Sequence, residues 1–258
     1  MTTQTNFQKV RDFNIAFGIS RYESENPNVF EENPSLVKLR LDLIKEETSE
    51  LEDAYNNFNC VEMIDALADI EYVVHGCADS FGINLDDYLA QSIINRNYLM
   101  SLLNTNNDNN KLKVDPKMSN CLVDKTKLVN EKLSYLIGKH SHIVETLERM
   151  INKKDFNECK NLLVELYDSV SNMSYCLGIH IDYIFDMVHK SNMSKLCSSM
   201  EEALETQKSY QNDKRYDSPM IRESPLKGMY VVYNQSTGKA LKSILYKPVT
   251  QNIIEYVS

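Results

Sequence analysis

The chain has 258 residues and carries 37 acidic against 28 basic side chains, which gives it a formal net charge of −9. Its 7 glycines and 6 prolines are too few for the turns of a β-sandwich or barrel, so a mostly helical protein is expected. The acidic balance argues against a protein that coats nucleic acid, because such proteins show a clustered basic face, and we expect no nucleic-acid partner.

Helical patterning dominates the first 103 residues. The predicted helices are a short one around Phe7–Phe17, a long one around Leu36–Phe58, a third from Val61 to about Phe81, and a fourth through Leu85–Leu103. Residues 104–120 are polar and rich in asparagine, which predicts a linker.

The remainder of the chain divides into a helical part and a tail of different character. Helical patterning resumes from about Lys125 and continues to Thr206. In the tail, residues 207–258, the runs Tyr230–Tyr233 and Lys239–Leu245 flank a loop that contains glycine. This arrangement predicts a small C-terminal β-hairpin.

A short motif occurs twice, at a spacing of 96 residues, as Gly82-Ile-x-x-Asp86 and as Gly178-Ile-x-x-Asp182. Such a corner fits a helix stop, a tight turn and an N-cap aspartate that begins the next helix. We therefore expect an internal duplication. The fold class that it predicts is an all-α helical bundle of two tandem units, 1–103 and 121–206, of which the second is degenerate.

The informative residues of the second predicted helix are acidic. An acidic side chain on a helix usually belongs to a solvated face. On a helical wheel of ~100° per residue, however, Glu47 and Glu50 fall inside the apolar arc, and Glu46 falls at its edge. A solvated face therefore does not explain Glu47 and Glu50.

The third predicted helix is apolar nearly all round, which marks it as buried. Glu62, Asp65 and Asp69 nevertheless share one arc of this helix. Glu71 and His75 are expected to form its solvent-facing stripe. A line of acids within a buried helix needs a partner, because burying an unpaired charge is costly.

A divalent cation is the expected partner of these acids. The connection between the two helices is short, so they are expected to be antiparallel neighbours that bring four acids together: Glu47, Glu50, Glu62 and Asp65. Two unit charges 4 Å apart repel by about 4 kcal/mol even at an effective dielectric constant of 20. We expect no Arg or Lys on these arcs to offset that repulsion. Because the ligands are carboxylate oxygens, Mg²⁺ is favoured, with Mn²⁺ as a substitute, over Zn²⁺ or a di-iron centre.

Two motifs resemble a known superfamily. Glu46-Glu47-x-x-Glu50, followed after eleven residues by Glu62-x-x-Asp65, resembles the E-E-x-x-E … E-x-x-D signature of the all-α nucleoside triphosphate pyrophosphohydrolases. That superfamily includes MazG-type enzymes, dimeric dUTPases and phosphoribosyl-ATP pyrophosphohydrolases. Val188–Leu196, with its S-N-M-S-K-L block, resembles the end of the helical core in the MazG-like branch, and Gly238–Ser243 resembles the hairpin extension of that branch.

The resemblance implies hydrolysis of a (d)NTP to a (d)NMP and pyrophosphate, in nucleotide-pool clearing. The metal ligands that it implies for Mg²⁺ are Glu47, Glu50, Glu62 and Asp65. It gives Glu46 and Asp69 a catalytic role, either supporting those ligands or accepting a proton from the attacking water, and leaves this choice open. The residues that would contact the nucleotide or its phosphates are Ser191, Asn192, Lys195, Lys239 and Lys242.

The two predicted units carry different halves of this site. The first unit has the metal carboxylates, whereas at a spacing of 96 the second has Glu158 for Glu62 but Asn161 for Asp65. The S-N-M-S-K-L block, in contrast, belongs to the second unit. We therefore expect one composite site per chain, with metal ligands from the first unit and phosphate contacts from the second.

Several alternatives stay open. The chain could be a catalytically inert nucleotide-binding or helical interaction protein, or a phosphoribosyl-ATP pyrophosphohydrolase. The base preference is not decided by Phe13, Phe17 or Tyr98, the aromatic residues that could line a base pocket. No apolar run approaches the ~18 residues of a membrane span, so no membrane partner is expected.

The cysteines and the duplication bear on location and assembly. The six cysteines include no C-x-x-C pair, which predicts neither a disulfide framework nor a zinc site, and favours a reducing, cytoplasmic location. The duplication could replace an ancestral dimer, or the pseudo-dimeric chains could pair again as a homodimer.

Overall fold

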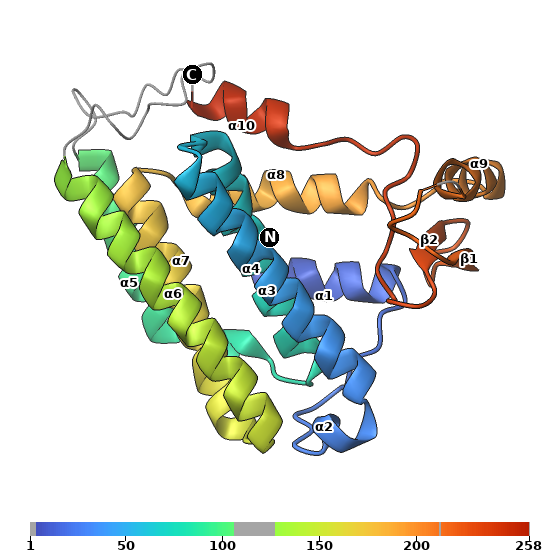
Figure 1. Cartoon of the computed structure of the whole chain (residues 1–258), viewed down its shortest axis with the longest axis horizontal. Coiled ribbons are helices and arrows are strands. Elements are labelled where there is room, and N and C mark those ends of the chain that lie inside the picture. Colours follow the sequence, from blue (N-terminus) through green and yellow to red (C-terminus); the bar gives the residue numbers. More distant parts are fainter. Residues whose placement is uncertain (1–3, 106–126, 212, 258) are drawn as a thin grey trace.

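Two antiparallel helical hairpins laid against each other form the centre of the molecule (Figure 1). The computed structural model describes residues 4–105, 127–211 and 213–257. The first hairpin consists of α3 (Pro34–Asn56) and α4 (Cys60–Ser80), and the second of α6 (Lys127–Lys153) and α7 (Phe156–Leu177). Helix α4 packs against α7, and α3 packs against α6. The mostly helical fold class predicted from the sequence is confirmed.

Local sequence explains where the central helices begin. The side chains of Asn33, Asn59 and Asp155 accept hydrogen bonds from the backbone N–H groups of Leu36, Glu62 and Glu158, the third residues of α3, α4 and α7. The two hairpin connections are tight, and each contains a residue with a left-handed backbone, at a φ of 55° and 58°. Both hairpins therefore turn within a few residues.

The remaining elements surround this centre. They are α1 (Asn6–Ala16), α2 (Val29–Glu32), the short 3₁₀ helix η1 (Leu85–Asp87), α5 (Ala90–Thr105), α8 (Ile181–Met193), α9 (Met200–Tyr210), β1 (Pro219–Glu223), β2 (Tyr230–Asn234) and α10 (Thr250–Val257). The sequence predicted neither α2 nor α10. The predicted linker, residues 104–120, lies outside the described residues from residue 106 onward.

The two hairpins exchange their flanking helices. Helix α8, which follows the second hairpin in sequence, packs against α4, and α5, which follows the first, packs against α7. The preceding corners also match, because Gly82 and Gly178 are left-handed (φ 75° and 73°) and the next N–H bonds back five residues to the helix carbonyl. This arrangement supports duplication, which stays our proposal.

The two aspartates of the repeated motif do not cap helices, contrary to the prediction. Asn84 and His180 occupy the N-cap positions instead. Asp86 accepts a hydrogen bond from the hydroxyl of Thr5 at 2.7 Å, and Asp182 accepts one from Arg96 at 2.9 Å. Both carboxylates are taken by tertiary partners, which local patterning does not reveal.

The β-hairpin exists, but the second of its predicted strands is wrong. Strand β2 pairs antiparallel with β1, the segment before it, with Ile221 opposite Val232. Lys239–Leu245, the predicted partner, contributes only an isolated bridge between Tyr233 and Ala240. The sequence of β1, Pro-Met-Ile-Arg-Glu, begins with proline and lacks the apolar–polar alternation of a strand, so it gave no strand signal.

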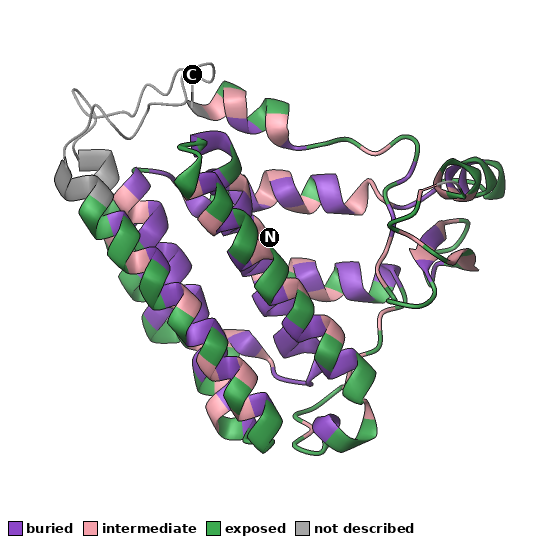
Figure 2. Ribbon diagram, in the orientation of Figure 1, coloured by how far each residue is buried: buried purple, intermediate pink, exposed green. Residues whose placement is uncertain are grey.

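Burial is greatest where α4 and α7 meet (Figure 2). Helix α4 is buried nearly all round, as predicted. The exception to that prediction concerns Glu71 and His75, which were expected to face solvent but are 0% and 1% exposed. Helices α1, α7 and α8 cover this side of α4, because the ring of His75 lies about 6 Å from those of Phe7, Tyr167 and Phe185. The expected solvent stripe is therefore a surface that packs against other helices.

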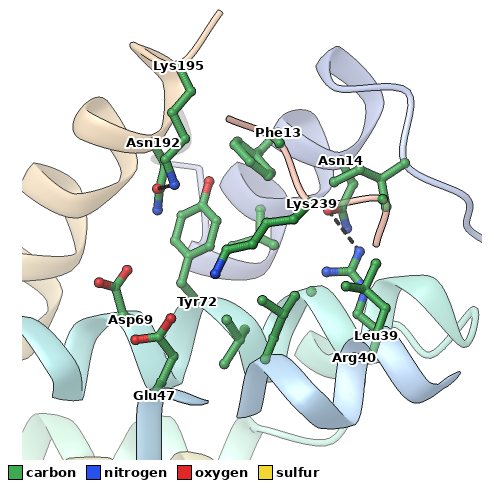
Figure 3. Close-up of a pocket in the computed structure, with 17 residues that line it drawn as sticks. Phe13, Asn14, Leu39, Arg40, Glu47, Asp69, Tyr72, Asn192, Lys195 and Lys239 are labelled. Atoms are coloured by element: carbon green, nitrogen blue, oxygen red, sulfur yellow. Dashed lines mark hydrogen bonds between the residues drawn. The ribbon is translucent and has the colours of Figure 1, made fainter. Parts of the chain in front are cut away.

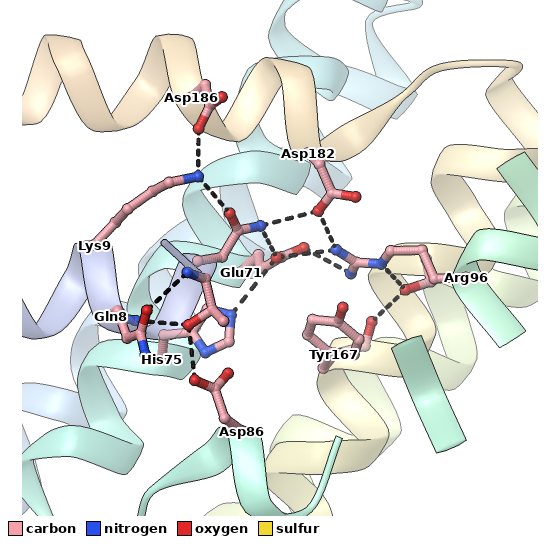
Figure 4. Close-up of polar contacts among 12 residues, drawn as sticks. Gln8, Lys9, Glu71, His75, Asp86, Arg96, Tyr167, Asp182 and Asp186 are labelled. Atoms are coloured by element: carbon pink, nitrogen blue, oxygen red, sulfur yellow. Dashed lines mark hydrogen bonds and ion pairs between the residues drawn. The ribbon is translucent and has the colours of Figure 1, made fainter. Parts of the chain in front are cut away.

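Glu71 is neutralised by a buried arginine from α5 (Figure 4). Arg96 donates through Nη2 and Nη1 to the two carboxylate oxygens at 2.7 and 3.1 Å, and its guanidinium lies 3.8 Å from the ring centre of Tyr167. Burial alone would raise the pKa of Glu71, but the charge of Arg96 holds that pKa well below its usual range. Arg96 also bonds Asp182 of α8 and Ser171 of α7, so one side chain joins four helices.

A buried histidine joins the two hairpins and makes stability depend on pH. His140 of α6 lies 2.7 Å from the hydroxyl of Ser169 and 3.2 Å from that of Thr48, and burial lowers its pKa to about 4. In the unfolded chain the imidazole of His140 takes up a proton near pH 6.5, whereas in the folded chain it does so only near pH 4. The contribution of His140 to folding stability is therefore present above pH 6.5 and is lost as the pH falls toward 4. This group's contribution amounts to about 3 kcal/mol.

We expect the His140→Gln protein to lose this dependence. Between pH 6.5 and 4 the Tm of the wild-type protein should fall by roughly 10 °C more than that of the variant, measured by scanning calorimetry. The matched control is His142→Gln, because His142 lies on the same helix with its side chain 70% exposed. An equal fall in all three proteins would contradict the expectation.

Two further findings concern membrane-spanning helices and the cysteines. No helix in residues 4–105, 127–211 or 213–257 is long and apolar enough to span a membrane. Cys60, at the start of α4, is disulfide-bonded, which the scattered cysteines did not predict. The other cysteines of the described ranges, Cys77, Cys159, Cys176 and Cys197, are free thiols.

Candidate active site

A pocket of about 120 Å³ lies where α1, α3, α4, the end of α8 and the tail converge (Figure 3). Glu47 and Asp69 stand at one end of it, Asn14 and Arg40 stand at the other, and Phe13 and Tyr72 lie between. The pocket is therefore polar at both ends and mainly apolar along its walls.

The structure places the six predicted acids on facing stretches of α3 and α4. Glu47 and Asp69 line the pocket. Asp65 is half-buried one turn before Asp69, whereas three acids are exposed: Glu46, Glu50 and Glu62. The acids form a row that leads from the solvent into the pocket.

The carboxyl groups in this row repel one another. Burial, and then the charges of Asp69 and Glu50, raise the pKa of Glu47 to about 9. Burial and the charge of Asp69 likewise raise the pKa of Asp65 to about 8, and the pKa values of Asp69 and Glu50 are also raised by burial. Without an added cation, Glu47 and Asp65 hold protons at neutral pH.

A hard cation fits these groups chemically. Their donors are all carboxylate oxygens, and buried Oδ1 of Asp65 has no hydrogen-bond partner among the described residues. In the positions that the described side chains take here, no three Asp, Glu, His or Cys residues gather around one point. The donor set and the unpartnered oxygen of Asp65 match Mg²⁺, and the acids are spread in a row along two helices.

The end of α8 brings the second half of the chain to the same pocket. Lys195 and Asn192 line it, and Lys195 Nζ donates to Asn192 Oδ1 at 2.5 Å. Burial lowers the pKa of Lys195, and the charge of nearby Asp69 opposes that shift. These two predicted phosphate contacts thus share one cavity with two of the predicted acids, Glu47 and Asp69.

The tail adds a second cation. Lys239 reaches into the pocket and forms an ion pair with Glu46, with Nζ 2.7 Å from Oε1 (Figure 3). Lys242 is exposed, with Nζ 4.8 Å from the ring centre of Tyr246, yet close enough to lower the pKa of Asp65 and of Asp69. The charge of the tail therefore acts on the acids as well as on the pocket.

Ser191 forms hydrogen bonds with the C-terminal tail and does not line the pocket. Its hydroxyl lies 2.8 Å from the carbonyl oxygen of Lys247, to which it donates, and 2.9 Å from the hydroxyl of Tyr246. Ser191 thereby holds the tail against the end of α8, next to Asn192.

Aromatic side chains form one wall. Phe13 meets Tyr72 edge-on with ring centres 5.4 Å apart, and the Tyr72 hydroxyl lies 3.1 Å from Nδ1 of His189. Phe17 stacks on Phe13 at 4.1 Å and is fully buried behind it. Tyr98 is 63% exposed on α5 and lies outside this cavity. Of the three aromatic residues considered from the sequence, only Phe13 lines the pocket.

The far end contains a cation that sequence reasoning missed. Arg40 is only 4% exposed, so the expectation that no Arg or Lys lies on the acidic arcs is wrong. Arg40 precedes Glu47 by seven residues, which places both on one face of α3 within about 20°. This spacing was the available signal, together with the buried neighbours Asn14 and Ser80, which bond its Nη2 and Nε at 3.1 and 2.7 Å.

A second pocket, of about 350 Å³, lies between α5, α6 and α7. Its lining includes Asn95, Arg96 and Leu99, which stand 96 residues before Ser191, Asn192 and Lys195. The acids of the second unit are dispersed: Glu145 is exposed, and Glu148 pairs with Lys45 at 3.0 Å.

Comparisons with known proteins found one matching family model and one relative. A family model described as phosphoribosyl-ATP pyrophosphohydrolase matches residues 10–97, which include all six acids. An uncharacterized protein of Acanthamoeba polyphaga mimivirus is 36% identical over 249 residues, which is 94% of this chain and 92% of the mimivirus protein. No solved structure matches the chain.

Proposed function

The chain belongs to the all-α nucleoside triphosphate pyrophosphohydrolase superfamily, in one family with the mimivirus relative, and on this premise we propose that it hydrolyses a (d)NTP to a (d)NMP and pyrophosphate. The observation that carries the proposal is the polarity of the pocket, with acids and lysines at one end and an aromatic wall beyond them. A triphosphate and a base would occupy these two parts.

Mg²⁺ would be held by Glu47, Glu50, Glu62 and Asp65, because a cation would replace the protons of the buried acids and offset the repulsion between them. When bound, it supplies counter-charge for phosphate oxygens and activation of a water. Mn²⁺ offers the same octahedral oxygen coordination and is the expected substitute.

Three further residues are assigned roles in phosphate binding, proton transfer and positioning. Lys195, half-buried beside Asp69, would bind a phosphate oxygen as a point charge. Asp69 lines the pocket and has a raised pKa, so we assign it the proton of the attacking water. Glu46 is exposed and paired with Lys239, and we infer that it positions that lysine.

Lys195→Ala is expected to lower kcat/KM by about a hundredfold, because one preorganised charge on the phosphates is lost. The rate of pyrophosphate release measures the effect. Glu158→Gln is the matched control, since Glu158 is the second-unit counterpart of Glu62 and lies in the first turn of α7. Loss of turnover in a folded Glu158→Gln protein would contradict the composite site.

The proposed reaction is tested by ³¹P NMR of the protein with Mg²⁺ and each common dNTP and NTP. Monophosphate and pyrophosphate should appear, and they should be absent when EDTA replaces Mg²⁺. Orthophosphate as the primary product would indicate cleavage at another phosphorus. Absence of turnover with every nucleotide would favour the inert nucleotide-binding protein.

A second candidate substrate is phosphoribosyl-ATP, which the description of the matching family model favours. The match ends at residue 97, however, and does not include Asn192, Lys195 or Lys239, which complete the pocket. Parallel assays with phosphoribosyl-ATP and with NTPs separate the two substrates. Nucleotide-pool clearing in the cytoplasm is the role that hydrolysis of free NTPs would support.

A further inference from the structure

The closed end of the pocket contains an arginine with one free amino group. Arg40 donates from Nε to Ser80 and from Nη2 to Asn14, while Nη1 has no hydrogen-bond partner among the described residues. Figure 3 shows the guanidinium with one nitrogen toward Asn14 and another toward the interior of the pocket. Arg40 as a whole is only 4% exposed, and one of its donors is thus left for a ligand in the pocket.

A glycine in α4 makes room for this nitrogen. A Cβ atom on Gly76 would lie 2.8 Å from Nη1 of Arg40, closer than real contacts allow. Glycine weakens the interior of a helix, and its presence here keeps the guanidinium in place against the pocket.

The neighbours of Arg40 determine which atoms donate and which accept hydrogen bonds at this end of the pocket. Asn14 donates from Nδ2 to Asp79 at 2.8 Å, so its Oδ1 is the atom that accepts from Arg40. Asp79 is buried and is itself held by Arg11 and Arg21, each at 3.1 Å. The acceptor oxygens of Asn14 and Asp79 are therefore already hydrogen-bonded, and the group that a ligand meets at this end of the pocket is the Nη1–H donor of Arg40.

The proposed function sets the direction in which a nucleotide enters. The phosphates belong with the lysines and acids, and the base lies along Phe13 and Tyr72. The edge of the base farthest from the sugar then faces Arg40. On that edge uracil, thymine, guanine and hypoxanthine carry a carbonyl oxygen, whereas cytosine and adenine carry an amino group.

We propose that Arg40 selects nucleotides whose base carries a carbonyl oxygen on the edge farthest from the sugar. The inference rests on the proposed function and narrows its substrate class. A carbonyl oxygen accepts the free Nη1–H, whereas an amino group would bring donor against donor beside the buried side chain of Arg40. Sites built for one hydrogen bond reject the ligand that cannot make it.

The test compares nucleotides that differ only at this edge, ITP with ATP and dUTP with dCTP. The carbonyl member of each pair should have roughly a ten- to hundredfold higher kcat/KM. Binding of IMP and AMP, measured by isothermal titration calorimetry, should show the same order without any turnover. In Arg40→Met the preference should disappear, and Gly76→Ala, which displaces the guanidinium, should reduce it.

Arg11→Gln is the control, because Arg11 bonds Asp79 and does not line the pocket. It should keep the preference. Equal binding of IMP and AMP by the wild-type protein would overturn the inference. A base preference that survives in both Arg40→Met and Gly76→Ala would also overturn it. So would an equal loss of affinity for all nucleotides in Arg40→Met, because that would indicate that Arg40 binds a phosphate. A preference in binding with no hydrolysis of any nucleotide would refute the proposed reaction and leave this inference standing.

Discussion

A Glu47→Gln protein is expected to lose about a thousandfold in kcat/KM and to become more resistant to heat in metal-free buffer at pH 8. The loss of activity follows because Glu47 lines the pocket and supplies a negatively charged oxygen to the proposed Mg²⁺ site. The gain in stability follows because burial and the neighbouring acids raise the pKa of Glu47 to about 9.

The sign of the pH effect is opposite to that of a salt-bridged carboxylate. Below the ordinary pKa of a glutamate, near 4.5, both the folded and the unfolded chain hold the proton, and the group's contribution to stability is fully present. As the pH rises toward 9, the unfolded chain releases that proton while the folded chain keeps it, so stability falls. Glutamine has no proton to release, and the variant should show a shallower fall.

Thermal unfolding in EDTA between pH 5 and 9 measures the stability, and ³¹P NMR with Mg²⁺ measures the turnover. Mg²⁺ should flatten the pH dependence of the wild-type protein, since a cation replaces the proton. Glu158→Gln, which alters an acid of α7, should change neither property. A Glu47→Gln protein that turned over nucleotides at the wild-type rate would move the site elsewhere.

The second large effect concerns stability alone. Glu71→Ala is expected to lower the free energy of unfolding by about 3–5 kcal/mol, because it leaves the guanidinium of Arg96 buried without its main partner. Replacing both residues with apolar side chains, as Glu71→Leu with Arg96→Met, should cost less than Glu71→Ala alone. Urea unfolding of the two single variants and the double variant measures the difference.

An exposed ion pair provides the comparison. Lys38 and Asp42 lie one turn apart on α3 at 2.5 Å, with side chains 75% and 53% exposed. Asp42→Ala should change the free energy of unfolding by less than about 0.5 kcal/mol. If Glu71→Ala were equally mild, the ion pair between α4 and α5 would not be holding the two helices together.

The helices and the acidic arcs could be predicted because both depend on the 3.6-residue period of a single helix. Glu47 and Asp69 line the pocket, whereas Glu50, which the wheel also placed inside the apolar arc, is exposed. Arg40 was within reach of the same method, and counting one heptad back from Glu47 finds it on the same face.

Other features depend on contacts between distant segments. Glu71 pairs with a residue 25 positions later, and whether it faces solvent or a partner depends on how α5 packs. Similarly, β1 is recognisable only through its pairing with β2, since its own sequence begins with proline and lacks a two-residue alternation of apolar and polar side chains. Periodicity describes one element at a time and carries no information on which neighbour will cover it.

The exchanged helices have an evolutionary consequence. If two separate copies of one polypeptide made this bundle, each inherited change would occur at both equivalent places. Here α5 and α8 belong to a single gene product, so Leu99 and Lys195 can diverge although they occupy corresponding positions. Selection for turnover then needs to act on one cavity only, and the cavity beside α5 is free to acquire a different chemistry.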